Sequence, residues 1–396
     1  MISSKMLELG KKSSIIREIF EYGKKRKMEI GAENVFDFSL GNPSVPAPQK
    51  VTDDMNKLIN ETPAEVLHGY TSAPGDLNTR SAIAENIKNK FNVDATANNI
   101  YMTCGAAASL TITLNAIAEE GDEVIAFAPF FPEYRVFVEQ SGARFVPVSC
   151  QKEDLQIDFD LLEKSITKNT KAVIVNSPNN PSGVIIPEGD IKKLADLLNN
   201  KQKEYGKEIF IISDEPYREL VFTEDAVPYI PSYYSNSFVC YSYSKALSLP
   251  GERIGYIFVS PDMKDSADVF AAVCGAGRAL GYVCAPSLMQ YTIRECLNDT
   301  ADINVYAKNR KILYDALTDI GYTVIKPDGA FYMFVKSLEE DANAFYERAK
   351  KFELLLVPSD SFGIPGFVRI SYCVDTDLIE RSIPAFKALY EDYKNE

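Results

Sequence analysis

One lysine stands at the end of an apolar segment, in surroundings that suit covalent chemistry. In "YSYSKALSLPGERIGYIFV", Lys245 follows Ser242 and Ser244, and Arg253 comes eight positions later. A lysine near the end of a buried strand has its pKa lowered and can form an imine with a carbonyl group. The serines and the arginine suit a phosphate, for which arginine is a charge partner. The stretch therefore offers an amine and an anion site together, unless the lysine simply reaches solvent.

Two further apolar segments end in residues suited to a phosphate and to a flat ring. In "YMTCGAAASL", Gly105, Ala106 and Ala107 open an expected helix directly after a short strand. Free backbone N–H groups at a helix start favour an anion such as phosphate, although small residues also begin helices for packing reasons. In "FAPFFPEY", two phenylalanines lie in a loop bounded by prolines. Such rings usually pack in a core, and stacking on a cofactor ring is the functional alternative.

A carboxylate and an amide end two more of the expected strands. In "IISDEPYREL", Asp214 ends a very apolar run and Tyr217 follows three residues later. A buried carboxylate is costly unless it pairs with a cation, which a protonated ring nitrogen would supply; the structural alternative is a helix N-cap. In "NSPNNPSGVIIP", Asn180 lies in a turn rich in Asn and Pro, where its side chain could reach a polar group of a ligand.

The composition excludes several classes of protein and of catalytic site. The 396-residue chain carries a formal net charge of −14, which argues against nucleic acid or an anionic membrane as a partner. Its apolar runs are shorter than the roughly 18 residues that a membrane span needs. Its seven cysteines form no C-x-x-C pair, as expected for reduced cysteines of a cytoplasmic protein. The single histidine, His68, excludes a His-rich metal site, so we expect no metal and interpret His68 as a loop or structural residue.

Short apolar strands alternate with helical segments from about residue 80 onward, which indicates an α/β fold with a mostly parallel central sheet flanked by helices. After about residue 300 a charged helix, a strand pair and further short elements predict a smaller α+β domain. Ligands of parallel α/β sheets bind outside the carboxyl ends of the strands. The five quoted segments end at expected strand ends, which is where a ligand site is expected.

Five motifs together resemble the class I/II aminotransferases, which are pyridoxal phosphate enzymes of fold type I, and in particular the aspartate aminotransferases. They are "NNPSG", "SDEPY", "SYSK" with an arginine eight residues on, "FVRIS", and a "GNP" loop near residue 41. Their order and spacing agree along nearly the whole chain. The resemblance predicts an N-terminal arm and part of the small domain at residues 1–48, a large cofactor-binding domain at 49–295, and the small domain at 296–396.

The resemblance implies a role for each cofactor-binding residue. Lys245 would form the Schiff base with pyridoxal 5'-phosphate and carry the proton during catalysis. Asp214 would pair with the pyridinium nitrogen, Tyr217 and Asn180 would hydrogen-bond the phenolic oxygen, and Phe131 would stack on the ring where many relatives have Trp or Tyr. The phosphate would be held by a set of small and basic residues, namely Gly105, Ala106, Ala107, Ser242, Ser244 and Arg253.

The resemblance also implies a homodimer with shared active sites. Tyr70, in "HGYTSAPGDLNTR", matches the tyrosine that reaches the phosphate of the neighbouring subunit. Arg369 would hold the substrate α-carboxylate, assisted by Gly41 and Asn180. Arg278 lies close to the position where dicarboxylate-specific relatives carry an arginine donated by the partner subunit.

The implied activity is transfer of an amino group from an L-amino acid, with aspartate preferred, to a 2-oxo acid such as 2-oxoglutarate. An aminotransferase for aromatic or neutral amino acids and a C–S β-lyase on the same fold are the alternatives. A non-catalytic ligand-binding domain is disfavoured by the intact lysine. A dinucleotide dehydrogenase is disfavoured because "GAGRALG" lacks the G-x-G-x-x-G spacing.

Overall fold

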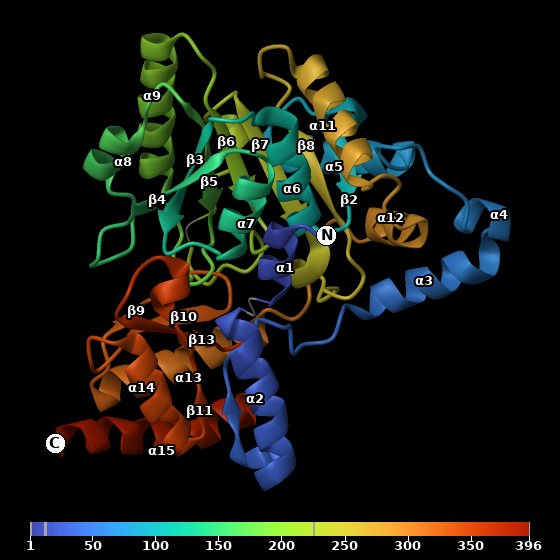
Figure 1. The fold of residues 1–396 in the computed structure, drawn as a ribbon. Coiled ribbons are helices and arrows are strands. Elements are labelled where there is room, and N and C mark those ends of the chain that lie inside the picture. The colour runs from blue at the N-terminus through green and yellow to red at the C-terminus, as the bar shows by residue number, and fades with distance from the viewer. Residues whose placement is uncertain (1, 12–13, 225, 396) are drawn as a thin grey trace.

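A seven-stranded sheet forms the centre of the larger part of the molecule (Figure 1), in a computed structural model that describes residues 2–11, 14–224 and 226–395. Across the sheet the strands are β2 (Ile100–Thr103), β8 (Gly255–Val259), β7 (Ser237–Ser242), β6 (Phe210–Asp214), β5 (Thr170–Asn176), β3 (Glu123–Ala128) and β4 (Arg144–Ser149). The expected α/β fold with a mostly parallel sheet is confirmed.

Strand β8 alone runs against its neighbours, antiparallel to both β2 and β7. The neighbouring pairs from β7 across to β4 are all parallel. The carboxyl ends of β2, β7, β6, β5, β3 and β4 therefore meet at one edge of the sheet, and the amino end of β8 lies at that same edge. This edge is where an α/β sheet binds its ligand.

Helices cover both faces of the sheet, because successive strand residues point to opposite sides. Val124 and Ala126 pack in one core cluster with residues of α6 (Ala106–Ile117), α7 (Glu133–Gln140) and α11 (Ser266–Leu280). Ile125 and Phe127 point the other way. On that face the packing helices are α8 (Phe159–Ser165), α9 (Glu188–Tyr205), α5 (Leu77–Phe91) and α12 (Ser287–Glu295).

A smaller α+β unit follows the large sheet and also takes in residues from near the N-terminus. Its antiparallel sheet has the order β12 (Val357–Pro358), β13 (Phe367–Ser371), β10 (Tyr332–Lys336) and β9 (Val324–Ile325). A two-stranded parallel sheet pairs β1 (Phe36–Asp37) with β11 (Leu354–Leu355). Around these lie α2 (Ile15–Ile30), α13 (Asn304–Ile320), α14 (Ala342–Ala349) and α15 (Thr376–Lys394). The residue numbers given above for the domain boundaries stay a prediction.

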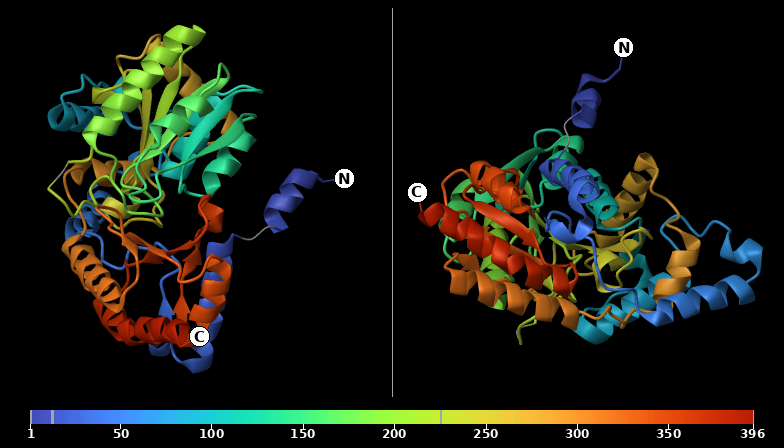
Figure 2. Two further views of the ribbon diagram at one scale, coloured as in Figure 1. Left: turned by 90° about the vertical axis from the view of Figure 1, so that its left-hand side faces the viewer. Right: turned by 90° about the horizontal axis from the view of Figure 1, so that it is seen from below.

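The remaining helices are short or peripheral. They are α1 (Ser4–Lys11), α3 (Gln49–Glu61), α4 (Ala64–Leu67) and α10 (Tyr243–Ala246), with 3-10 turns at Ala32–Asn34, Ala97–Asn99, Ile230–Ser232, Lys350–Phe352 and Ser359–Phe362. Helix α1 buries no residue and stands away from the body of the molecule in Figure 2. Among the described residues, no helix is both long and apolar enough to span a membrane.

Candidate active site

Lys245 lies on α10, the single helical turn that begins where β7 ends. The Ser242 side chain caps this turn by accepting a hydrogen bond from the backbone N–H of Ser244. The Lys245 Nζ donates to the carbonyl oxygen of Gly41 at 2.7 Å. The pKa of Lys245 is lowered from 10.5 to about 8, chiefly by burial, and the charges of Arg253 and Arg369 act in the same direction. Near neutral pH a small but useful fraction of the amine is neutral, the form that acts as base or nucleophile.

A polar cradle lies beside this lysine at the same edge of the sheet. The Arg253 Nη1 donates to the Ser244 hydroxyl at 3.4 Å, and Nη2 donates to the carbonyl oxygen of Cys104 at 3.2 Å. The Ser242 and Ser244 hydroxyls are 2.8 Å apart. Gly105 caps α6 with a φ of +88°, and a Cβ added there would lie 2.7 Å from Arg253 Nη2. The missing side chain thus keeps the cradle open.

The start of α6 completes this cradle. Ala106 and Ala107 are the first two residues of the helix, so their backbone N–H groups have no partner within it. Ala107 is exposed and Ala106 is half-buried. Helix N–H groups, two hydroxyls and a guanidinium in one place form the donor set that a phosphate monoester requires.

Asp214 is a buried carboxylate at the end of β6 with one oxygen unpaired. Its Oδ2 accepts a hydrogen bond from the Tyr134 hydroxyl, whereas its Oδ1 has no hydrogen-bond partner among the described residues. Burial raises the pKa of Asp214 from 3.8 to about 7, while the bond from Tyr134 opposes the shift. An orphaned buried carboxylate oxygen fits a cationic N–H group such as a pyridinium nitrogen.

Tyr134 is a functional candidate that was not predicted. It closes the quoted stretch "FAPFFPEY", but tyrosines are common in this chain, with 22 in all, and no local pattern marks the one that reaches Asp214. Phe131, in the same stretch, is half-buried and meets the Tyr134 ring edge-on with the ring centres 5.6 Å apart. The structure therefore places Phe131 next to the partner of Asp214.

Arg369, on β13, is a buried guanidinium that is only partly satisfied. It donates to the Asn180 Oδ1 at 3.1 Å and to the Ser39 carbonyl oxygen at 2.6 Å. Its Nε has no partner among the described residues. Burial lowers the pKa of Arg369. A buried guanidinium with a free N–H and no carboxylate partner fits the carboxylate of a ligand.

Tyr217 hydrogen-bonds a second residue that sequence reasoning missed. Its hydroxyl lies 3.0 Å from that of Tyr332 on β10, and both tyrosines are buried. The Tyr332 ring lies under the guanidinium of Arg369, 4.6 Å from it. A Cβ on Gly41 would collide with the Tyr332 hydroxyl. Tyr217, Gly41 and Arg369 are thus brought together around one tyrosine.

Three of the singled-out residues lie apart from this group of contacts. Tyr70, in the loop after α4, is 98% exposed, and Arg278 is exposed in the last turn of α11. Among the described residues, neither side chain has a hydrogen bond or an ion pair. His68 is exposed at the end of α4. The "GAGRALG" segment lies at the end of helix α11 and the glycine that caps it, rather than between a strand and a helix.

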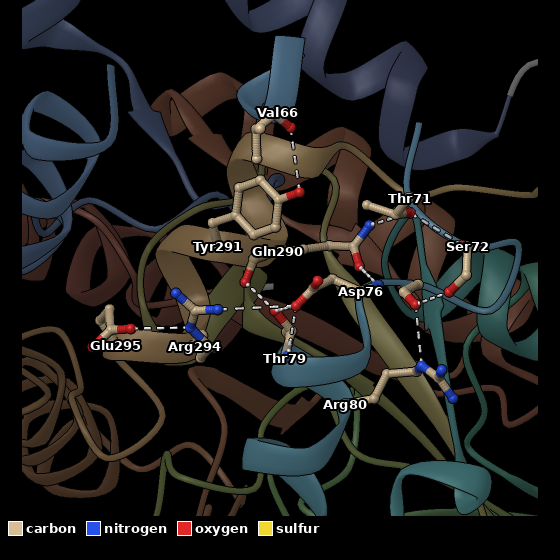
Figure 3. Close-up of polar contacts among 11 residues, drawn as sticks. Val66, Thr71, Ser72, Asp76, Thr79, Arg80, Gln290, Tyr291, Arg294 and Glu295 are labelled. Carbon is tan, nitrogen blue, oxygen red and sulfur yellow. Dashed lines mark hydrogen bonds and ion pairs between the residues drawn. The ribbon is translucent and has the colours of Figure 1, made fainter. Parts of the chain in front are cut away.

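Hydrogen bonds shown in Figure 3 connect the loop that follows Tyr70 to α12. The buried Gln290 accepts a hydrogen bond from the Asp76 backbone N–H at 2.7 Å and donates to the Thr71 hydroxyl at 3.4 Å. The Thr79 hydroxyl donates to the backbone carbonyl oxygen of Gln290 at 3.1 Å. Tyr70 is therefore an exposed side chain next to an anchored segment.

No group of three or more His, Cys, Asp or Glu side chains that could hold a metal ion occurs in the part of the chain that the structure describes. The donor set is instead one of hydroxyls, backbone N–H groups, a lysine, two arginines and a lone carboxylate oxygen. This set suits an anionic organic ligand.

Comparison with known proteins identifies the class of this chain. The sequence profile of the family "Aminotransferase class I and II" matches residues 33–386. A solved aminotransferase from Eubacterium rectale is 56% identical, with a TM-score of 0.98 and 99% of each chain covered.

Two further relatives are more distant in sequence. "Probable aspartate aminotransferase" of Methanocaldococcus jannaschii is 28% identical over 404 residues, covering 99% of this chain and 100% of that protein. "Probable N-acetyl-LL-diaminopimelate aminotransferase" of Bacillus subtilis is 30% identical over 363 residues, covering 89% of this chain and 88% of that protein.

The chain belongs to the class I and II aminotransferase family, as the resemblance predicted. It is an aminotransferase, an enzyme whose substrates are amino acids and 2-oxo acids, and this family works with pyridoxal 5'-phosphate.

Proposed function

We propose that this aminotransferase binds pyridoxal 5'-phosphate through Lys245. The observation that carries the proposal is the position of the buried Lys245 amine, which is near enough to Arg253 and Arg369 for both charges to act on it and has its pKa lowered to about 8. The residues present fit the cofactor: Asp214 has a free Oδ1, and Gly105 leaves room beside Arg253. When bound, the cofactor supplies a carbonyl carbon for amines and an electron-withdrawing ring.

The chain's own residues would divide the work of binding and proton transfer. Gly105, Ala106, Ala107, Ser242, Ser244 and Arg253 would hold the phosphate. The Asp214 Oδ1 would hold a proton at the ring nitrogen, and Tyr217 and Asn180 would donate to the phenolic oxygen, with Phe131 against the ring.

The substrate would be held and deprotonated by two basic residues. Arg369 would bind the α-carboxylate through its free N–H, with Asn180 and the Gly41 segment beside it. The Lys245 Nζ would take the proton from the substrate Cα and return it during the second half of the reaction. A lysine with a lowered pKa suits both directions of this transfer, because it is neither fully charged nor fully neutral near pH 8.

We infer that the preferred amino donor is aspartate and the acceptor 2-oxoglutarate. A relative that covers 99% of this chain bears the name "Probable aspartate aminotransferase". The exposed Arg278 would serve a second carboxylate if a partner subunit brings it to the neighbouring site. The homodimer, the role of Tyr70 at the partner's phosphate and a cytoplasmic location belong to the same proposal. A steady-state screen of acidic, aromatic and other neutral donors tests it.

The decisive experiment for Lys245 is chemical fixation of the cofactor. Purified protein loaded with pyridoxal phosphate is expected to be yellow, and borohydride should attach the cofactor to the peptide that contains Lys245. Lys245→Ala should lose turnover by about a thousandfold or more, because the base and the attachment point disappear together. Lys201→Ala is the matched control, since Lys201 is also a shielded lysine, with its side chain 14% exposed.

Fixation to another peptide, or full turnover by Lys245→Ala, would overturn the assignment. A colourless wild-type protein that binds no cofactor would overturn the proposal as a whole.

A further inference from the structure

Tyr332 touches residues that the proposed function assigns to two different ligands. Its hydroxyl is 3.0 Å from that of Tyr217, the residue proposed to face the cofactor. Its ring lies 4.6 Å from the guanidinium of Arg369, the residue proposed to bind the substrate carboxylate. Tyr332 is itself 3% exposed, on β10 next to the strand that carries Arg369. One side chain therefore spans both halves of the site.

The third neighbour of Tyr332 is the Gly41 segment. A Cβ on Gly41 would collide with the Tyr332 hydroxyl, so the glycine backbone packs directly on the phenol. The same Gly41 offers its carbonyl oxygen to the Lys245 Nζ at 2.7 Å. The phenol therefore packs against the segment whose carbonyl oxygen accepts from the lysine.

We propose that Tyr332 is a positioning residue with two separable tasks: its hydroxyl orients the Tyr217 hydroxyl, and its ring orients the Arg369 guanidinium. The inference rests on the proposed function, because it takes Tyr217 as the residue on the cofactor side and Arg369 as the carboxylate site.

The task of the hydroxyl follows from counting hydrogens. Tyr217 and Tyr332 have one hydroxyl hydrogen each, and each hydroxyl has the other as its hydrogen-bond partner among the described residues. While the two hydroxyls are bonded to each other, Tyr217 has its own hydrogen available for the phenolic oxygen of the cofactor only if Tyr332 donates in their mutual bond. A Tyr217 that accepts from Tyr332 is also the stronger donor, because linked hydrogen bonds polarise one another.

The task of the ring follows from the shape of the guanidinium. The planar group has rings on it from Tyr332 and from Phe362, the latter at 5.3 Å. Its terminal nitrogens bond Asn180 and the Ser39 carbonyl, and its Nε is free. Aromatic faces attract a guanidinium and hold its plane, which directs the free N–H toward one place. The ring should therefore affect binding of carboxylates, and the hydroxyl should not.

Tyr332→Phe tests the hydroxyl alone, since the ring and its packing stay. The readout is the pH midpoint of the change in visible absorption of the holoenzyme, measured without substrate. A donor to the phenolic oxygen stabilises the negative charge on that oxygen. It thereby lowers the pKa of the cofactor-bound Lys245 nitrogen, which would share a proton with the oxygen. We expect the midpoint of Tyr332→Phe to rise by about half a pH unit, because Tyr217 keeps its hydrogen for the phenolic oxygen but loses the polarisation that a bond from Tyr332 adds. The KM for amino acid should stay near the wild-type value.

Tyr332→Leu removes the aromatic ring as well as the hydroxyl, so its comparison with Tyr332→Phe tests the ring. We expect the KM for the amino acid to rise about tenfold above that of Tyr332→Phe, because the guanidinium loses an aromatic contact, while kcat changes much less. Visible absorption in the same sample shows whether this variant still folds and binds the cofactor. If Tyr332→Leu fails to fold, Tyr332→Phe together with the corresponding Phe362→Leu variant separates the two tasks.

Tyr322→Phe is the matched control, because it also removes a buried tyrosine hydroxyl, one that donates to the Phe386 carbonyl oxygen within the small domain. An unshifted midpoint in Tyr332→Phe, equal to that of the control, would overturn the hydroxyl part. Equal KM values in the Leu and Phe variants would overturn the ring part. Failure of the proposed function looks different, since the wild-type protein itself would then show no visible band.

Discussion

Asp214 is a single residue whose buried, half-paired carboxyl group favours the binding of a cationic group. Its carboxyl group is buried, its pKa is raised to about 7 by burial, and its Oδ1 has no partner in the described chain. The hydroxyl of Tyr134 supplies one hydrogen bond and leaves the other oxygen for a ligand. Such a group destabilises the empty protein once it ionises and favours whatever cation binds beside it.

The raised pKa of Asp214 predicts a pH dependence for the cofactor-free protein. Between pH 3.8 and about 7 the folded protein keeps a proton that the unfolded chain has lost. The free energy of unfolding should therefore fall as the pH rises through this window, by at most about 4 kcal/mol from this group. Asp214→Asn should remove that slope. Guanidinium unfolding of the cofactor-free protein at about pH 5 and about pH 7 measures it.

The control for this prediction is Asp190→Asn, since burial raises the pKa of Asp190 as well, at a more exposed position on α9. It should leave most of the slope in place. Identical slopes in the wild-type protein and Asp214→Asn would contradict the prediction. Adding pyridoxal phosphate should flatten the slope in the wild-type protein, because a cation beside the carboxylate keeps it ionised.

At the scale of elements, the junction between β2 and α6 makes the proposed phosphate cradle. Gly105 holds a left-handed φ of +88°, and the space where a Cβ would lie is bounded by Arg253. Arg253 itself has a φ of +50°, an unfavourable backbone conformation for a residue with a side chain. Two residues of the cradle thus have a positive φ.

Gly105→Ala is expected to weaken both stability and cofactor binding. The backbone conformation of Gly105, with φ +88° and ψ 174°, costs about 1–3 kcal/mol for a residue with a Cβ, and the collision with Arg253 Nη2 pushes that side chain out of the cradle. Gly142→Ala is the matched control, because Gly142 has a φ of +91° while its added Cβ would meet nothing nearer than 3.8 Å. Both variants should lose stability because both positions have a positive φ, and only Gly105→Ala should lose cofactor affinity in a fluorescence titration. Equal affinity in the two variants would remove Gly105 from the cradle.

At the scale of the whole molecule, the exposed side chains around Tyr70 are consistent with the proposed homodimer. Tyr70 is 98% exposed beside a loop that Gln290 anchors. Large apolar side chains nearby in the chain are also exposed, at Ile59, Val66 and Leu77. An exposed tyrosine on a fixed loop suits a contact with a second copy, because little conformational entropy is lost on binding.

Mixing two defective variants tests whether the sites are shared. Lys245→Ala should be inactive, and Arg278→Ala should lose most of its kcat/KM for aspartate, about 2–5 kcal/mol if a charge pair breaks, while neutral donors change little. In a dimer with shared sites, a mixed pair has one site with both residues intact. Equal mixing should therefore restore aspartate turnover to about a quarter of the wild-type value.

Mixtures with Arg381→Ala in place of Arg278→Ala are the control, since Arg381 is an exposed arginine on α15 paired with Asp377. No recovery in the Arg278 mixture would place that residue outside the partner's site. Unchanged aspartate turnover in Arg278→Ala alone would remove it from the active site and leave the donor open.

The sequence by itself was sufficient to predict the class of fold and the family. The alternation of apolar strands and helices is a local pattern, because side chains in strands point alternately to two faces and parallel strands need crossover helices. The motifs around Lys245, Asp214 and Arg369 are likewise short and read in order along the chain. The charged helix expected after about residue 300 is also a local pattern, and it spans Asn304–Ile320.

Which residues of the site lie in contact could be learned only from the tertiary structure. The contacts of the site join residues far apart in the chain: Tyr134 and Asp214 are 80 positions apart, Arg369 and Asn180 are 189, and Lys245 and Gly41 are 204. Tyr332 and Tyr134 carry no local mark among 22 tyrosines. The reversed direction of β8, which brings Arg253 to the edge where the other strands end, follows from pairing with β2 and β7. Strand direction depends on packing and hydrogen bonding between distant segments, which no stretch of sequence contains on its own.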